Sequence, residues 1–188
     1  MTAAYTPSQT IGPFFAILLP LGNSNLVADG ATGAITVYGQ LFDAEGAPVG
    51  DALIELWQAN AEGRYNHLAD TRELLLDASF SGFGRCQTAA NGSFSFLTVK
   101  PGKVPGAGES WQAPHLNLTI FARGLLNQLH TRMYFPDEPA ANAADPLRAS
   151  ITDSDVRATV MAHQSGPGAF QFDIRLGGER ETAFLAIE

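Results

Sequence analysis

The sequence is poor in cysteine and in charge, and both shortages narrow the classes of protein that it can encode. Its only cysteine, Cys86, excludes an internal disulfide and a thiolate metal cluster, and it is typical of a reducing compartment. Charged residues make up 16% of the chain, and Asp and Glu outnumber Lys and Arg by 19 to 11. The resulting net charge of −8 argues against nucleic acid or an anionic membrane as a partner.

Long apolar runs are also missing. No run approaches the roughly 18 residues that a membrane-spanning helix needs, and the N-terminus lacks the basic and apolar segments of a secretory signal. We therefore expect a cytoplasmic protein with no membrane partner. The low charge also suggests that another subunit covers part of the surface.

Glycine and proline are plentiful, at 19 and 11 residues, and they divide the 188-residue chain into short segments. Between these turns, apolar and polar residues alternate as they do in half-buried strands. The predicted strands are Ile35–Phe42, Leu53–Gln58, Phe94–Val99, Leu116–Arg123, Thr131–Phe135 and Phe170–Arg175. The pattern predicts an all-β fold, a mixed β-sandwich with long loops.

One short helix is expected late in the chain. Asp153 or Ser154 supplies its N-cap, and Gly166 followed by Pro167 ends it. The alanine-rich stretch Pro139–Asp145 is expected to be a surface loop.

The N-terminal residues differ from the rest of the sequence. TPSQTIGPFF, from Thr6 to Phe15, has no clear period, and the prolines at both ends of this stretch favour a stiff, extended segment. We predict that residues 1–30 form an arm that contacts a partner chain, and that residues 31–188 form the sandwich.

Residues 37–65 read VYGQLFDAEGAPVGDALIELWQANAEGRY, with Gly63 and Tyr65 at the end. This stretch resembles the signature of the intradiol ring-cleavage dioxygenases. Further blocks that resemble the family follow in order at Phe80–Arg85, Thr98–Gly102, Ala113–His115 and Phe170–Leu185. The arm and the segment APHLNLTIFARG are most similar to the α subunits of the two-subunit members, which cleave 3,4-dihydroxybenzoate with O2 to 3-carboxy-cis,cis-muconate.

The resemblance implies a site for ferric iron held by two tyrosinates and two histidines. Tyr65 matches the first tyrosine and His115 the first histidine, whereas Val104 and Asn117 stand at the other two positions. We call these four the relict ligand positions. An arginine that precedes the histidine pair in the family is Gln112 here. A tyrosine and a histidine alone leave ferric iron under-coordinated, so we expect no metal on this chain and Fe(3+) on a homologous β chain. Tyr65 and His115 are then expected to be hydrogen-bonded packing residues.

What the chain contributes is therefore expected to lie in its partner's site. In α subunits of the family, the residues that correspond to Thr10, Gly12 and Pro13 line the partner's pocket, and the arginine of the FARG block, here Arg123, reaches it. A guanidinium suits an aromatic carboxylate substrate. Arg132 is a weaker candidate for the same role.

Strand geometry agrees with a role for Arg123 outside this chain's own site. At the usual rise, the eight residues from His115 to Arg123 span roughly 26 Å, so Arg123 cannot serve the relict positions. The resemblance implies αβ units in a larger assembly, which we expect to be as large as a dodecamer of αβ.

Three alternatives stay open at this point. His115, His130 and a carboxylate, Glu55 or Asp173, could form a facial triad for ferrous iron, although nothing in their spacing favours it. The chain could instead be a self-sufficient, homo-oligomeric intradiol dioxygenase of the catechol type. It could also be a non-catalytic β-sandwich binding module.

Overall fold

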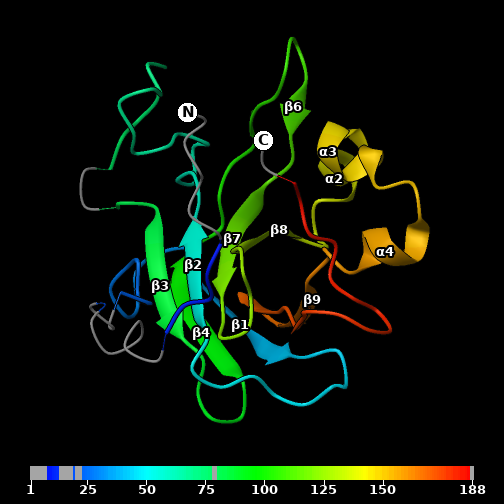
Figure 1. The fold of residues 1–188 in the computed structure, drawn as a ribbon. Coiled ribbons are helices and arrows are strands. Elements are labelled where there is room, and N and C mark those ends of the chain that lie inside the picture. Colours follow the sequence, from blue (N-terminus) through cyan, green and yellow to red (C-terminus); the bar gives the residue numbers. More distant parts are fainter. Residues whose placement is uncertain (1–7, 13–18, 20–22, 78–79, 187–188) are drawn as a thin grey trace, which may run out of the picture.

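The computed structural model describes residues 8–12, 19, 23–77 and 80–186, and its main body is two facing β-sheets (Figure 1). One sheet contains β1 (Ala34–Phe42), β4 (Ser93–Val99), β9 (His163–Gly166), β10 (Ala169–Gln171) and β11 (Ile174–Arg175). The other has the order β3 (Phe83–Gln87), β2 (Leu53–Trp57), β7 (His115–Phe121) and β8 (Leu129–Tyr134). A separate ribbon pairs β5 (Val104–Pro105) with β6 (Trp111–Gln112).

The first sheet is mixed because β1 has neighbours of both directions. It pairs antiparallel with β4 and parallel with β10 and β11, which share its other edge. All pairs in the second sheet are antiparallel. The predicted mixed β-sandwich is therefore confirmed, and each of the six predicted strands overlaps a strand of the structure.

The core lies between the sheets and follows the alternation that predicted them. Along β1, every second residue is buried, and Val37 and Leu41 are fully so. Leu56 of β2, Leu118 of β7 and Phe170 of β10 belong to the same apolar cluster. Because the inward faces are apolar, the polar relict positions must lie at the outer face or the end of the second sheet.

The helices correct two expectations. The predicted late helix begins at its N-cap Asp153, whose carboxylate accepts from two backbone N–H groups, but α4 covers only Ser154–Ala158. The expected loop Pro139–Asp145 is wrong, because α2 covers Pro139–Ala144 and α3 covers Pro146–Ser150. Each begins at a proline, which suits a first helical turn because proline has no N–H to leave unpaired. The described part of the chain thus has three short helices rather than one, and none of them is long and apolar enough to span a membrane.

The end of the predicted arm packs on this chain's own sandwich. Asn23 forms an isolated bridge to Arg85, Asn25 forms one to Leu97, and Leu26 is buried in the core. Thr10 and Gly12 are described and exposed, whereas Pro13 and the aromatic end of the TPSQTIGPFF stretch lie outside the described residues. The division at residue 30 stays a prediction.

Candidate functional site

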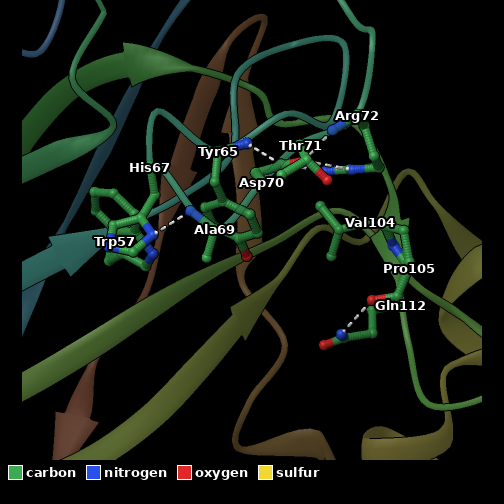
Figure 2. Close-up of a pocket in the computed structure, with 10 residues that line it drawn as sticks. All are labelled: Trp57, Tyr65, His67, Ala69, Asp70, Thr71, Arg72, Val104, Pro105 and Gln112. Carbon is green, nitrogen blue, oxygen red and sulfur yellow. Dashed lines mark hydrogen bonds and ion pairs between the residues drawn. The ribbon is translucent and has the colours of Figure 1, made fainter.

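A cavity of about 640 Å³ lies between the loop that follows β2 and the β5–β6 ribbon. Figure 2 shows that Tyr65 lies beside Trp57 on one side of the cavity, with Val104, Pro105 and Gln112 opposite. The remaining lining residues are His67, Ala69, Asp70, Thr71 and Arg72. The cavity therefore contains two residues from the relict ligand positions, Tyr65 and Val104.

A tight turn after β2 presents Tyr65. The side-chain oxygen of Asn60 accepts from the backbone N–H groups of Glu62 and Arg64 at 3.0 and 2.9 Å, which closes the turn. Gly63 at its centre has φ +78°, and a Cβ there would overlap the carbonyl oxygen of Lys103. Only glycine suits both requirements, so the turn can lie directly against the loop that leads into β5.

Asp70 fixes the start of the next loop. Its carboxylate accepts from the backbone N–H of Tyr65 at 2.8 Å and forms an ion pair with Arg72. Hydrogen bonds from Arg72 hold the pKa of the Asp70 carboxyl well below its usual range. The guanidinium also donates to the carbonyl of Gly63 at 2.7 Å, so the charge of Arg72 is committed within the loop.

Tyr65 itself is packed rather than free. Its ring stacks on Trp57 with the ring centroids 5.6 Å apart, and the Asn117 amide donates to the carbonyl of that same Trp57 at 3.3 Å. Burial raises the pKa of the Tyr65 phenol, and the charge of Arg132 and the nearby Asn117 side chain oppose that rise. The structure thus brings Tyr65 and Asn117 together and places Val104, which is buried, in the same cavity wall.

His115 is buried at the start of β7, with 3% of its surface exposed. Its Nδ1 lies 2.7 Å from the carbonyl oxygen of Ala113, as expected for a hydrogen-bonded core residue, whereas its Nε2 has no hydrogen-bond partner. Burial, together with the charge of Arg132, lowers the pKa of the His115 imidazole to about 4. At neutral pH this histidine is uncharged.

Arg132 lies across from these residues because β7 and β8 pair with Asn117 opposite Arg132. Its Nε donates to Asn117 Oδ1 at 2.9 Å, and its Nη1 donates to Gln112 Oε1 at 2.6 Å. Sequence reasoning ranked Arg132 only as a weaker candidate for the partner's pocket. The structure instead directs it into this chain's own relict site.

The residues present do not fit ferric iron. Of the four relict ligand positions, Val104 has no donor atom and Asn117 offers a neutral amide, which binds a highly charged ion poorly. Among the described residues, no group of three or more His, Cys, Asp or Glu side chains is close enough to hold a metal ion.

The residues of the ferrous-triad alternative are engaged elsewhere. His130 Nδ1 lies 3.1 Å from Thr119 Oγ1, and Glu55 is paired with Arg85. Asp173 accepts from the backbone N–H of Gln40 at 3.0 Å. The structure does not bring these side chains together with His115.

A second cluster forms at the far end of β7, where the chain turns after Phe121. Arg123 is exposed and forms an ion pair with Asp51, at 2.8 Å between Nη2 and Oδ2. The next residue, Gly124, donates its backbone N–H to Thr10 Oγ1 at 2.7 Å. The structure therefore brings Thr10 of the arm to the FARG turn. Gly12 is exposed, with open space around its Cα, so nothing within this chain requires a glycine there.

Sequence reasoning missed Asp145, which holds this end of the second sheet together. Its side chain is fully buried and accepts from Ala113 N, Arg148 N and the hydroxyl of Tyr134 at 2.8, 2.9 and 3.1 Å. An aspartate directly before a proline signals the helix N-cap that it forms. Its two longer-range bonds have no local signal.

Comparisons with known proteins agree with the fold. A dioxygenase family model matches residues 12–178. The protocatechuate 3,4-dioxygenase alpha chain of Pseudomonas putida is 40% identical, over 96% of this chain and 95% of its own length. The beta chain of Burkholderia cepacia is 36% identical, over 79% of this chain and 66% of its own length. The solved dioxygenase domain of a dioxygenase carbohydrate-binding protein fusion from Streptomyces sp. SirexAA-E superposes with a TM-score of 0.62 at 30% identity, covering 92% of this chain and 98% of that domain. The chain belongs to the intradiol ring-cleavage dioxygenase family.

Proposed function

We propose that this chain is the iron-free α subunit of a protocatechuate 3,4-dioxygenase, and that it completes the substrate pocket of a homologous β chain. The observation that carries the proposal is the pairing of an incomplete ligand set with near full-length similarity to an α chain. Tyr65 and His115 alone stand at ligand positions, so the catalytic iron belongs on the partner. The complex cleaves 3,4-dihydroxybenzoate with O2.

The contribution of this chain to the partner's pocket lies at the FARG turn. Thr10 joins the arm to Gly124, and the side chain of Arg123 next to it is 62% exposed. Its guanidinium would bind the carboxylate of an aromatic acid by a forked hydrogen bond. Gly12, and Pro13 beyond it, would line the same pocket, with the glycine allowing the partner or the substrate to approach the backbone closely.

The surface of the chain agrees with a partner of this kind. Leu126, two residues beyond Gly124, is 60% exposed, and Leu68 and Leu75 in the loop beside the cavity are 98% and 76% exposed. Large apolar side chains in such positions mark surfaces that another subunit covers. Pairing of two homologous sandwiches would bury them, and such αβ units would assemble further, up to a dodecamer of αβ, in the cytoplasm.

Metal content tests the assignment. The chain purified alone is expected to contain no iron, and the chain purified with its β partner about one iron per αβ pair. Stoichiometric iron on the chain alone would instead favour a self-sufficient homo-oligomeric dioxygenase. Absence of any complex with a β chain would favour a non-catalytic binding module.

Arg123→Ala tests the substrate role. In the αβ complex we expect KM for 3,4-dihydroxybenzoate to rise by about tenfold to a hundredfold while iron content is unchanged, because a charge-assisted hydrogen bond is lost. Arg123→Lys keeps the charge but not the forked hydrogen bond, so its KM should lie between those of the unaltered complex and Arg123→Ala. Arg180→Ala, which removes an exposed arginine from the C-terminal loop, is the matched control and should leave KM unchanged. Unaltered KM in Arg123→Ala would refute the role of this residue.

A further inference from the structure

Arg132 lies among the residues at the relict ligand positions. Its guanidinium donates directly to Asn117, which stands where the second histidine ligand is expected. The Asn117 side chain in turn lowers the pKa of Tyr65. The other arm of the guanidinium bonds to Gln112, which stands where the family has an arginine. In this chain the positive charge beside position 112 therefore comes from Arg132 of β8 and not from position 112 itself.

The charge of Arg132 acts on Tyr65 and His115, the two residues at ligand positions that could still bind a metal. Burial is the first influence on each, raising the pKa of Tyr65 and lowering that of His115. The next influence on both is the charge of Arg132, which lowers both pKa values. Three of the four relict positions, Tyr65, His115 and Asn117, thus surround the guanidinium within bonding or electrostatic range.

Neutral groups supply the bonds to this charge. None of the ion pairs among the described residues includes Arg132. Its acceptors are the amide oxygens of Asn117 and Gln112, and it also interacts with the hydroxyl of Tyr134. That same hydroxyl donates to the buried carboxylate of Asp145 at 3.1 Å. The guanidinium of Arg132 therefore lies among the relict positions with neutral hydrogen-bond acceptors and, within the described part of the chain, no ion-pair partner.

We propose that the guanidinium of Arg132 takes the place of the metal ion in the relict site and excludes metal from it, independently of the missing ligands. The inference rests on the proposed role of this chain as the subunit without iron. A ferric ion entering the site would face a fixed positive charge in surroundings that screen charge poorly. It would also have to displace two hydrogen bonds that hold the guanidinium in place. The loss of Val104 and Asn117 as ligands and the gain of Arg132 are then two separate barriers to metal.

Exclusion of metal would matter to the assembled enzyme. In the proposed pair of homologous sandwiches, this one still has a tyrosine and a histidine, Tyr65 and His115, at ligand positions. A second cation in the α chain would compete for iron with the partner and place an oxygen-reactive ion at a pocket that cannot complete the reaction. A built-in guanidinium fixes the metal content at one iron per pair.

The test restores the ligands with and without the cation. Three variants of the full chain are co-produced with the β partner: Val104→Tyr with Asn117→His, the same pair with Arg132→Gln, and the same pair with Arg132→Lys. We expect iron to rise from about one to about two per αβ pair only with Arg132→Gln, together with stronger visible absorption from the tyrosinate-to-iron band. Arg132→Lys keeps the positive charge, so the iron content of that variant should stay near one per αβ pair. Circular dichroism and thermal unfolding show whether each variant is folded.

Two outcomes overturn the proposal. One is a second iron in the ligand-restored chain that still has Arg132, and the other is no gain of iron in the folded variant with Arg132→Gln. Two irons per pair in the unaltered complex would instead refute the proposed function itself. If Val104→Tyr prevents folding, Asn117→His is compared with and without Arg132→Gln, using Co²⁺ alone as the probe. Calorimetry should then show binding about tenfold tighter without Arg132, a change of the size that second-sphere groups produce, and equal affinities would contradict the proposal.

Discussion

Asp51 has a backbone conformation that few residues other than glycine adopt, with φ +58°, and its carboxylate pairs with Arg123. Both side chains are well exposed, at 43% and 62%, so water screens the ion pair and its contribution to stability is small. A strained residue that contributes little stability is typical of a functional site. We interpret Asp51 as a positioning residue that directs the guanidinium of Arg123.

Substitutions at Asp51 can separate the effect of its backbone strain on stability from the effect of its carboxylate on the orientation of Arg123. Asp51→Gly suits the left-handed conformation and removes the carboxylate, so we expect the free energy of unfolding to change by less than about 0.5 kcal/mol. Asp51→Ala removes the same carboxylate but is strained and should cost about 1 kcal/mol more. Both should raise KM for the substrate of the αβ complex by the same factor, while kcat is unchanged. An unchanged KM in both variants would show that Asp51 does not direct Arg123.

His115 makes stability depend on pH. Its pKa is lowered from an ordinary value of 6.5 to about 4, first by burial. The unfolded chain therefore binds a proton below pH 6.5 that the folded chain does not bind until about pH 4. The stabilisation is complete above the unfolded pKa and is lost as pH falls through this window, by about 3 kcal/mol in total.

Urea unfolding at a series of pH values tests this expectation. His115→Gln should be less stable than the unaltered chain at neutral pH but should lose less stability on acidification. His163→Gln removes an exposed histidine from β9 and serves as the control, with an unaltered pH dependence. Parallel pH profiles for the unaltered chain and His115→Gln would contradict the assigned burial of the neutral imidazole.

The residues of the relict site show how far sequence reasoning could go. Tyr65, Val104, His115 and Asn117 were assigned to ligand positions from the family blocks, and His115 is buried and hydrogen-bonded as expected. The contacts of Arg132 with this site were not predicted. They depend on which residue of β8 lies opposite Asn117, and register across two strands has no signal in either strand alone.

At the scale of elements, the turn that presents Tyr65 depends on glycine in a way that substitution can measure. Gly63→Ala adds the strain of a left-handed alanine and an overlap with Lys103. Gly30 has nearly the same φ, +77°, with open space around it, so Gly30→Ala carries the strain alone. We expect a loss of about 1 kcal/mol for Gly30→Ala and at least about 2 kcal/mol for Gly63→Ala, measured by chemical unfolding. Equal losses would show that close packing of this turn on the Lys103 loop is not required.

Helix α2 was not predicted because the sequence of this segment favours two interpretations. Alanine-rich Pro139–Ala144 has the propensity for a helix, but it is short, and its two flanking prolines favour an interpretation as a loop. In the structure both prolines start helices, and Asn142 fixes α2 by donating to the carbonyl of Phe135 at 2.7 Å. Such contacts outside the helix stabilise a segment that is too short to be helical by propensity alone.

At the scale of the whole molecule, sequence reasoning identified the sandwich because its core alternates so regularly along β1, β4 and β7. It also predicted that the two ends of β7 contribute to different sites. One end carries the relict site around His115, and the other carries Arg123 and the arm. The face that the partner covers could not be predicted, since exposure of Leu68, Leu75 and Leu126 depends on how the loops fold.

The parallel pairing of β1 with β10 and β11 sets an order of events during synthesis. β1 ends at Phe42, yet the strands that cover its second edge begin at Ala169 and Ile174, near the end of the chain. While the ribosome makes the residues between them, β1 can pair with β4 but keeps one open edge, which other strands can join. Closing such distant contacts is slow, so the nascent chain is prone to aggregation until its last strands emerge. An enzyme built from two such chains benefits when both are made close together, because each can cover the apolar surface of the other as soon as its sheet closes.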